Sequence, residues 1–142
     1  MSFLLDTNVV SEWAEPRPSG DVVVWLSDVD EDRVFLSVAT LAEIRYGVDR
    51  MPGGQRRDRL AAWLVDDLPA RFEHRILDID PGVADAWGVV MARGQISGRT
   101  IGVMDAFFAA TALRYALTLV TRNVADFDHL GVELLNPWTD GQ

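Results

Sequence analysis

The sequence lacks two residue types, cysteine and lysine. Without cysteine, neither disulfide bonds nor thiolate metal sites can form, and a reducing compartment is compatible with the chain. Because lysine is absent, all 13 basic residues are arginine. P-loop nucleotide-binding proteins need a phosphate-binding lysine and Schiff-base enzymes need a lysine amine, so the composition excludes both classes.

The sequence also lacks a long hydrophobic run. Asp6 interrupts the apolar start at Phe3–Leu5, and no later stretch reaches the roughly 18 apolar residues of a membrane-spanning helix. No positively charged segment followed by an apolar stretch indicates a secretion signal. We therefore expect a soluble, cytoplasmic protein that does not associate with membranes.

Acidic residues outnumber basic ones by 22 to 13, which gives a formal net charge of −9. Broad affinity for a phosphate backbone normally requires a basic domain. A nucleic-acid enzyme of this composition would therefore need bound cations and a few local arginines to approach its substrate.

The length of 142 residues and the hydrophobic content of 49% suit one compact domain spanning residues 1–142.

Strand-like segments alternate with amphipathic helical segments along the chain. Because each crossover between parallel strands needs a covering helix, this order predicts an α/β fold in which helices sandwich a parallel sheet. Ligands of such sheets collect at the carboxyl ends of the strands. The expected strands are 3–5, 34–38, 75–79, 117–121 and 132–135, and the expected helices are 9–13, 19–29, 39–51, 55–72, 81–95 and 103–116.

Three acidic residues stand out by their positions. Asp6 follows the first strand, where a buried carboxylate needs a partner, although a helix cap also explains it. Glu43 flanks the apolar stripe of its helix, and the alternative is an ordinary exposed glutamate. Asp105 shares a helix face with alanines that leave room beside the carboxylate. Its alternative is a first-turn aspartate that favours the helix dipole.

A polar cluster, Thr121–Phe127, follows the fourth strand and contains Asn123 and Asp126. Turn chemistry alone explains both residues, so their interest depends on convergence with the other acids. Carboxylates about 4 Å apart repel by about 4 kcal/mol per pair at an effective dielectric of about 20, which calls for a divalent cation or an arginine. Oxygen ligands without histidine or thiolate select Mg²⁺ or Mn²⁺ rather than zinc.

Four stretches occur in a fixed order along the chain, namely LLDTNVVSE, AEIRYGV, MDAFFAATAL, and LVTRNVADF followed by LLNPW. Together they resemble the PIN-domain family and, within it, the toxin nucleases of VapC type, over residues 3 to about 138. The resemblance implies a three-layer α/β/α sandwich with a mainly parallel sheet and a magnesium-dependent ribonuclease site. It also implies a homodimer and a cognate antitoxin that joins it in a higher-order complex.

By this resemblance, Asp6, Glu43 and Asp105 are the acids of the metal site. Asp6 and Asp105 are expected to hold Mg²⁺ directly, and Glu43 to hold it through water or to orient the attacking water. The implied reaction is hydrolysis of an RNA phosphodiester by water, in which Mg²⁺, or Mn²⁺ in its place, acidifies water and neutralises phosphate charge. The identity of the RNA stays open, as does the choice between one and two metal ions.

The fourth residue of the implied site lies in the TRNVADF segment. Asp126 is favoured for its charge and is assigned to the metal site, while Asn123 is the alternative, with Thr121 assisting. Asp126 and Asn123 are therefore both candidate catalytic residues.

Two other functions compete with the nuclease. One is a PIN-fold scaffold without catalytic activity, and the other is an aspartate-based phosphatase or phosphotransfer domain, which normally uses a lysine that this chain lacks. Three arginines, Arg45, Arg99 and Arg122, are candidates to hold flanking phosphates, with an ordinary structural role as the alternative for each. We expect His74 and His129 near the surface and assign them no chemistry.

Overall fold

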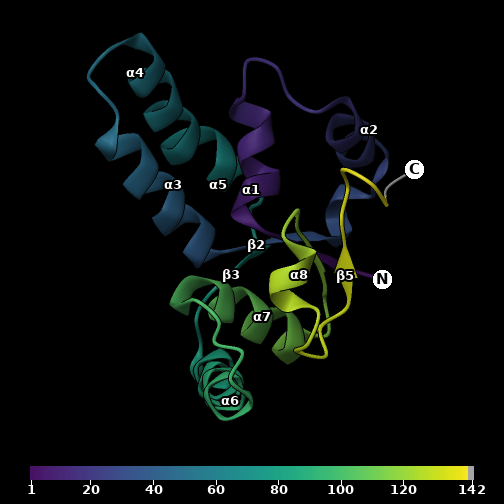
Figure 1. Ribbon diagram of the computed structural model, residues 1–142. Coiled ribbons are helices and arrows are strands. Elements are labelled where there is room, and N and C mark those ends of the chain that lie inside the picture. The colour runs from purple at the N-terminus through teal and green to yellow at the C-terminus, as the bar shows by residue number, and fades with distance from the viewer. Residues whose placement is uncertain (141–142) are drawn as a thin grey trace.

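Five short strands form the centre of the molecule in the computed structural model, which describes residues 1–140 (Figure 1). Their order across the sheet is β3-β2-β1-β4-β5, and all neighbouring strands are parallel. The chain therefore builds outward from β1 in one direction and then returns to build in the other. The strands are β1 (Phe3–Leu5), β2 (Val34–Ser37), β3 (Ile76–Leu77), β4 (Thr118–Val120) and β5 (Leu134–Leu135).

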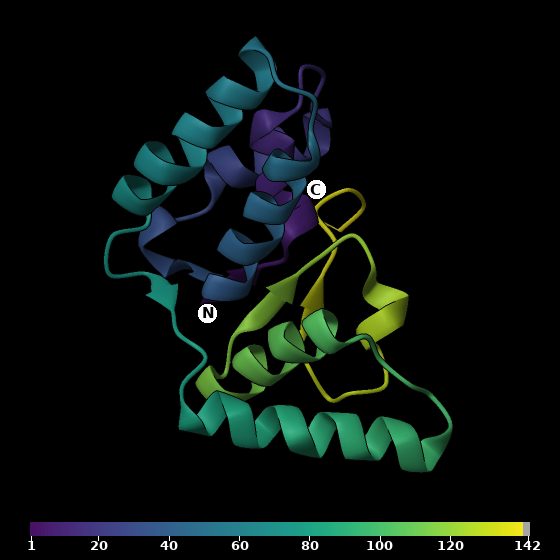
Figure 2. The same ribbon diagram turned by 90° about the vertical axis from the view of Figure 1, so that its left-hand side faces the viewer.

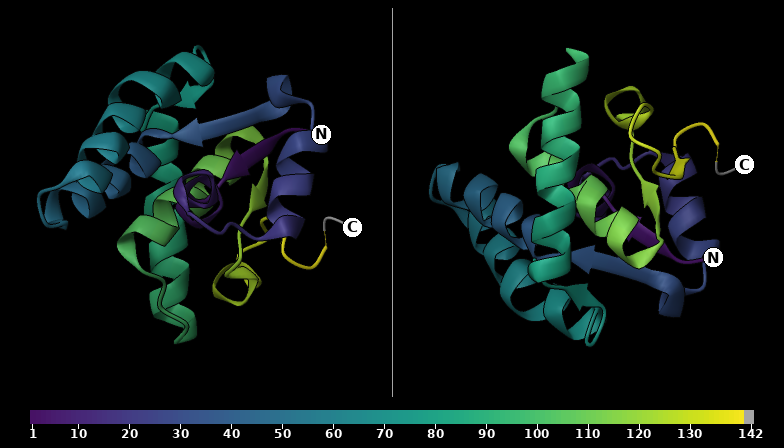
Figure 3. Two further views of the ribbon diagram at one scale, coloured as in Figure 1. Left: turned by 90° about the horizontal axis from the view of Figure 1, so that it is seen from above. Right: turned by 90° about the horizontal axis from the view of Figure 1, so that it is seen from below.

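Helices cover both faces of this sheet. The pair α6 and α7 lies side by side along one face, and the helices from α1 to α5 lie on the other (Figures 2 and 3). The helical segments are α1 (Thr7–Val10), η1 (Ser11–Ala14), α2 (Gly20–Asp28), η2 (Glu31–Arg33), α3 (Val38–Arg50), α4 (Gln55–Ala62), η3 (Trp63–Asp67), α5 (Leu68–Arg71), α6 (Pro81–Ser97), α7 (Val103–Tyr115) and α8 (Val124–Phe127).

Each face of the sheet has its own hydrophobic core. Because successive strand residues point to opposite faces, Leu4 packs against the α6–α7 side and Leu5 against the α1–α5 side. In β4, Leu119 and Val120 divide between the two cores in the same way. All four side chains are fully buried. Two cores separated by one parallel sheet confirm the predicted three-layer α/β/α architecture.

The strand order places the two central strands, β1 and β4, at the point where the chain reverses direction across the sheet. Helices on either side of such a point leave a crevice at the carboxyl ends of the strands. Asp6 directly follows β1, and its backbone N–H donates to the carbonyl of Val120, the last residue of β4. Thr121 follows β4. The two residues therefore begin the candidate site.

All the predicted helices and strands exist, with shifted ends. The third and fifth strands are shorter than expected, because only two residues of each pair with a neighbour. The helix predicted over 55–72 spans α4, η3 and α5 and continues through Pro69. Proline lacks the N–H that an α-helix needs there, and the wider π-helical turn η3 precedes it. Across residues 1–140, no helix is both long and apolar enough to cross a bilayer.

Candidate active site

Asp6 is a buried carboxylate with a full set of partners, only 5% exposed. Its Oδ1 accepts a hydrogen bond from the backbone N–H of Thr7 at 2.7 Å, which makes Asp6 the N-cap of α1. Its Oδ2 accepts from the hydroxyl of Thr121 at 2.7 Å. Burial raises the pKa of Asp6 to about 6, and repulsion from Asp105 and Glu43 acts in the same direction. Asp6 therefore caps α1, and its negative charge is disfavoured by burial and by the neighbouring carboxylates.

Glu43 is tied to the same region through Thr7. The hydroxyl of Thr7 donates to Oε1 of Glu43 at 2.6 Å, and the hydroxyl of Thr40 lies 3.2 Å from that of Thr7. Glu43 is half-buried rather than freely exposed. One residue, Thr7, therefore connects the end of β1 to the helix α3 that carries Glu43.

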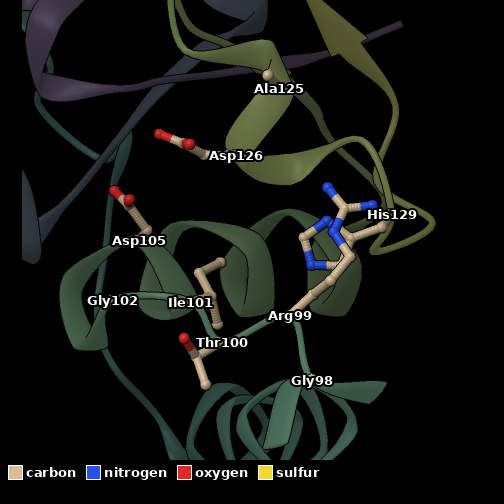
Figure 4. A pocket seen from close by; sticks show the side chains of 9 residues that line it. All are labelled: Gly98, Arg99, Thr100, Ile101, Gly102, Asp105, Ala125, Asp126 and His129. Carbon is tan, nitrogen blue, oxygen red and sulfur yellow. The ribbon is translucent and has the colours of Figure 1, made fainter.

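Asp105 lies in the first turn of α7 and is half-buried. Burial raises the pKa of this carboxyl, followed in size by repulsion from Asp126 and then from Glu43. Asp126, on α8, is exposed. In Figure 4 the carboxylates of Asp105 and Asp126 extend from two different helices toward the same space. Electrostatic repulsion thus links four acids that lie far apart in the sequence.

The two candidates for the fourth position differ in their contacts. Asn123 is exposed, and its backbone N–H donates to the hydroxyl of Thr121 at 3.0 Å, while its side chain makes no capping hydrogen bond to α8. Asp126 raises the pKa of Asp105 directly. Thr121 connects the segment that carries Asn123 to Asp6, because its hydroxyl accepts a hydrogen bond from the backbone N–H of Asn123 and donates one to Asp6.

A polar pocket of about 420 Å³ opens beside Asp105 and Asp126. Its floor is the loop that joins α6 to α7, and Asp105 and Asp126 lie at one end of it (Figure 4). The lining residues are Gly98, Arg99, Thr100, Ile101, Gly102, Asp105, Ala125, Asp126 and His129. The pocket is large enough for a small polar ligand such as one nucleotide.

A family profile named PIN domain matches residues 3–133. The matched region covers the strands β1 and β4 and every acid described above. The chain belongs to the PIN-domain family. The parallel sheet with helices on both faces is the architecture that this family membership implies.

Two relatives and one solved structure match this PIN domain over almost their whole length. Toxin FitB of Neisseria gonorrhoeae is 36% identical over 138 residues, which cover 97% of this chain and 99% of FitB. VapC ribonuclease Y4jK of Sinorhizobium fredii is 33% identical over 136 residues, 96% of this chain and 97% of Y4jK. The crystal structure of FitAcB from N. gonorrhoeae superimposes with a TM-score of 0.91 at 36% identity, covering 96% of this chain and 99% of the FitAcB chain.

The residues of this PIN domain suit Mg²⁺ by their chemistry. The donors are carboxylate oxygens, the ligands that Mg²⁺ prefers. The pKa values of Asp6 and Asp105 are raised by burial and by repulsion from neighbouring carboxylates, which a cation would relieve. Within residues 1–140, no three side chains of ligand type already converge closely enough to hold an ion. Since Mg²⁺ keeps several waters and needs only one or two direct carboxylates, the donor set still fits.

Sequence reasoning missed two contributors to this PIN domain's site. Thr7 connects Asp6 to Glu43, and only its place directly after Asp6 could have suggested a role beyond capping. His129, expected near the surface and assigned no chemistry, is partly buried: its side chain is 17% exposed and lines the pocket. The prediction holds for His74, whose side chain is 90% exposed. Nothing in the sequence around His129 distinguishes the two.

Proposed function

We propose that the protein is a metal-dependent endoribonuclease, the toxin of a toxin–antitoxin pair. One observation carries the proposal: Asp6, Glu43, Asp105 and Asp126 act on one another electrostatically at the carboxyl ends of β1 and β4, beside a polar pocket. Acids that destabilise each other in this way are common where chemistry requires them. The relationship to a protein named VapC ribonuclease supports RNA as the substrate.

The residues take distinct roles in this proposal. Asp6 and Asp105 would hold Mg²⁺ directly, with Asp126 as the fourth metal-site residue and Asn123 beside it. Glu43, fixed by Thr7, would orient the attacking water. When bound, Mg²⁺ supplies Lewis acidity and neutralises charge on the phosphodiester, which lets an acidic pocket receive an anionic substrate.

The proposal extends to the partners. The relationship to Toxin FitB and to the FitAcB structure supports a cognate antitoxin. With a net charge of −9, this chain would suit an antitoxin segment rich in arginine, which covers the site and neutralises its carboxylates. We further propose that the toxin is a cytoplasmic homodimer, which the antitoxin joins in a higher-order complex.

Purified protein, refolded after removal of any bound partner, should cleave RNA with Mg²⁺ or Mn²⁺ and stop with excess chelator. Replacing Glu43 with glutamine should slow cleavage about 10- to 100-fold, because the water-orienting charge is lost while the fold is kept. The rate is measured on a labelled RNA under single-turnover conditions.

The matched control is Glu73→Gln, which changes an exposed glutamate far from the site in sequence and should leave the rate unchanged. If Glu43→Gln cleaved RNA as fast as the unmodified protein, the activity would belong to a contaminating nuclease. Absence of cleavage by the unmodified protein on every RNA tested would favour the scaffold without catalytic activity.

A further inference from the structure

The structure separates the three arginines that were candidates to contact phosphate. Arg45 pairs with Asp49 one turn along α3, at 3.1 Å. The guanidinium of Arg122 lies 5.1 Å from the ring centre of Trp138. Arg99 alone of these three lines the pocket that also contains Asp105 and Asp126. Arg99 is therefore the candidate that lies on the path of a bound substrate.

Two glycines fix the loop that carries Arg99. Gly98 ends α6 in the left-handed conformation, with φ of 76°, which glycine adopts without strain. Gly94 lets the loop lie directly on α6, because a Cβ at this position would lie 2.8 Å from the carbonyl oxygen of Arg99. The backbone of Arg99 is therefore set by packing against α6, and the loop forms a defined floor for the pocket.

His129 forms the other side of this end of the pocket. Both of its ring nitrogens are buried, and neither has a hydrogen-bond partner in the protein. Oδ1 of Asp128 lies 3.6 Å from Nδ1, which is too long for a hydrogen bond. Because both nitrogens are closed off from the pocket, the rest of the ring lines it, and His129 forms a wall there beside Arg99.

Arg99 shares the same carboxylate. Its Nη2 lies 3.1 Å from Oδ1 of Asp128, the same oxygen that lies 3.6 Å from Nδ1 of His129. The side chains of Arg99 and Asp128 are both more than half exposed, and ion pairs of this kind contribute little to stability. A phosphate group offers a guanidinium stronger, bidentate contacts. Arg99 is therefore held in place but free to exchange Asp128 for a phosphate.

We propose that this end of the pocket is a nucleotide subsite, which binds the RNA nucleotide next to the phosphodiester that is cleaved. The inference rests on the proposed nuclease function. Arg99 contacts the phosphate that flanks the cleaved bond, and the ring of His129 packs against the base or ribose. Asp105 and Asp126 lie at the opposite end of the same pocket, so one strand would cross from the acids to the basic end (Figure 4).

The test measures binding rather than cleavage. A fluorescent tetranucleotide RNA with phosphorothioate linkages is titrated in Mg²⁺ at several salt concentrations. Replacing Arg99 with alanine should weaken binding about 10-fold, the usual effect of one charge-assisted contact. The plot of log affinity against log salt should become less steep by about 0.7, the value for one phosphate contact on a single strand.

Two further variants distinguish direct contact with the RNA from an effect on the stability of the fold. Arg99→Lys keeps the charge, so it should restore the salt dependence of the unmodified protein while recovering only part of the affinity. His129→Ala should weaken binding about fivefold, as expected for the loss of one aromatic contact with the nucleotide, and should leave the salt slope unchanged. A purely structural role for Arg99 would change folding stability without changing the salt slope.

Arg33 provides the matched control. It forms an exposed ion pair with Asp30, with side chains 58% and 61% exposed, close to the 54% and 58% of Arg99 and Asp128. Arg33→Ala should leave affinity and salt slope unchanged. If Arg99→Ala matched Arg33→Ala in both quantities, the subsite would be wrong even if the protein cleaves RNA. If the unmodified protein bound the tetranucleotide as predicted but cleaved no RNA, the nuclease function would fail, while the contact between Arg99 and an RNA phosphate would stand.

Discussion

Replacing Asp6 with asparagine lowers the rate of RNA cleavage about 10³-fold or more and, at neutral pH, makes the metal-free protein more stable. Under the proposed function, the rate falls because the variant loses a charged ligand for Mg²⁺, whose transition-state stabilisation amounts to several kcal/mol. Stability rises because the asparagine removes a buried charge that other carboxylates repel. Opposite signs for activity and stability distinguish a functional acid from a structural one.

The stability gain should be about 2 kcal/mol at pH 7.5, somewhat below the full electrostatic cost, because an amide cannot accept both hydrogen bonds that Asp6 accepts from Thr7 and Thr121. Urea unfolding in chelator gives this quantity. Asp85→Asn, an exposed aspartate on α6, is the control and should change neither rate nor stability. A less stable Asp6→Asn protein would show that Asp6 acts mainly as a helix cap.

The free energy of unfolding of the metal-free protein should fall as the pH is raised from about 4 to about 7. The folded-state pKa of Asp6 is about 6 and its ordinary value is 3.8, so in this window the folded state binds more protons than the unfolded state. Stability is therefore greatest where Asp6 is protonated in both states and declines until the folded carboxyl has ionised. The raised pKa of Asp105 acts in the same direction.

The difference between 3.8 and about 6, at about 1.4 kcal/mol per pKa unit, corresponds to a loss of about 3 kcal/mol for Asp6. Other groups also titrate, so the informative quantity is the unmodified protein minus Asp6→Asn, measured by urea unfolding at half-unit pH steps. Asp80, whose pKa is lowered chiefly by the hydroxyl of Tyr115, loses its contribution only below this window and is present in both proteins. A difference independent of pH would contradict the raised pKa.

The sequence was sufficient to predict the architecture because local pattern and packing agree. Leu4 and Leu5 lie in a run too short for anything but a buried strand, and they fill both cores as a central parallel strand must. Asp6 could be identified as unusual for the same reason, since a charge directly after a buried strand needs partners. Parallel topology then brings the ends of β1 and β4 together whatever their separation in sequence.

The details of the site depended on contacts that no periodicity encodes. The hydroxyl of Thr121 and the hydroxyl of Thr7 orient two acids through hydrogen bonds across 115 and 36 positions, respectively. His129 lines one pocket together with the loop after α6, which brings together segments far apart in the sequence, and the residues near His129 do not reveal this. The choice between Asn123 and Asp126 as the fourth metal-site residue also stays a prediction.

Calorimetric titration of Mn²⁺ into the purified protein tests most directly whether these acids form one cation site. The unmodified protein should bind one or two ions per chain and release protons as Asp6 gives up its proton, more at pH 6 than at pH 8. Asp6→Asn and Asp105→Asn should each abolish or greatly weaken the binding, and Asp85→Asn should not. Binding that survives in both site variants, or no binding to the unmodified protein, would contradict a shared metal site at the ends of β1 and β4.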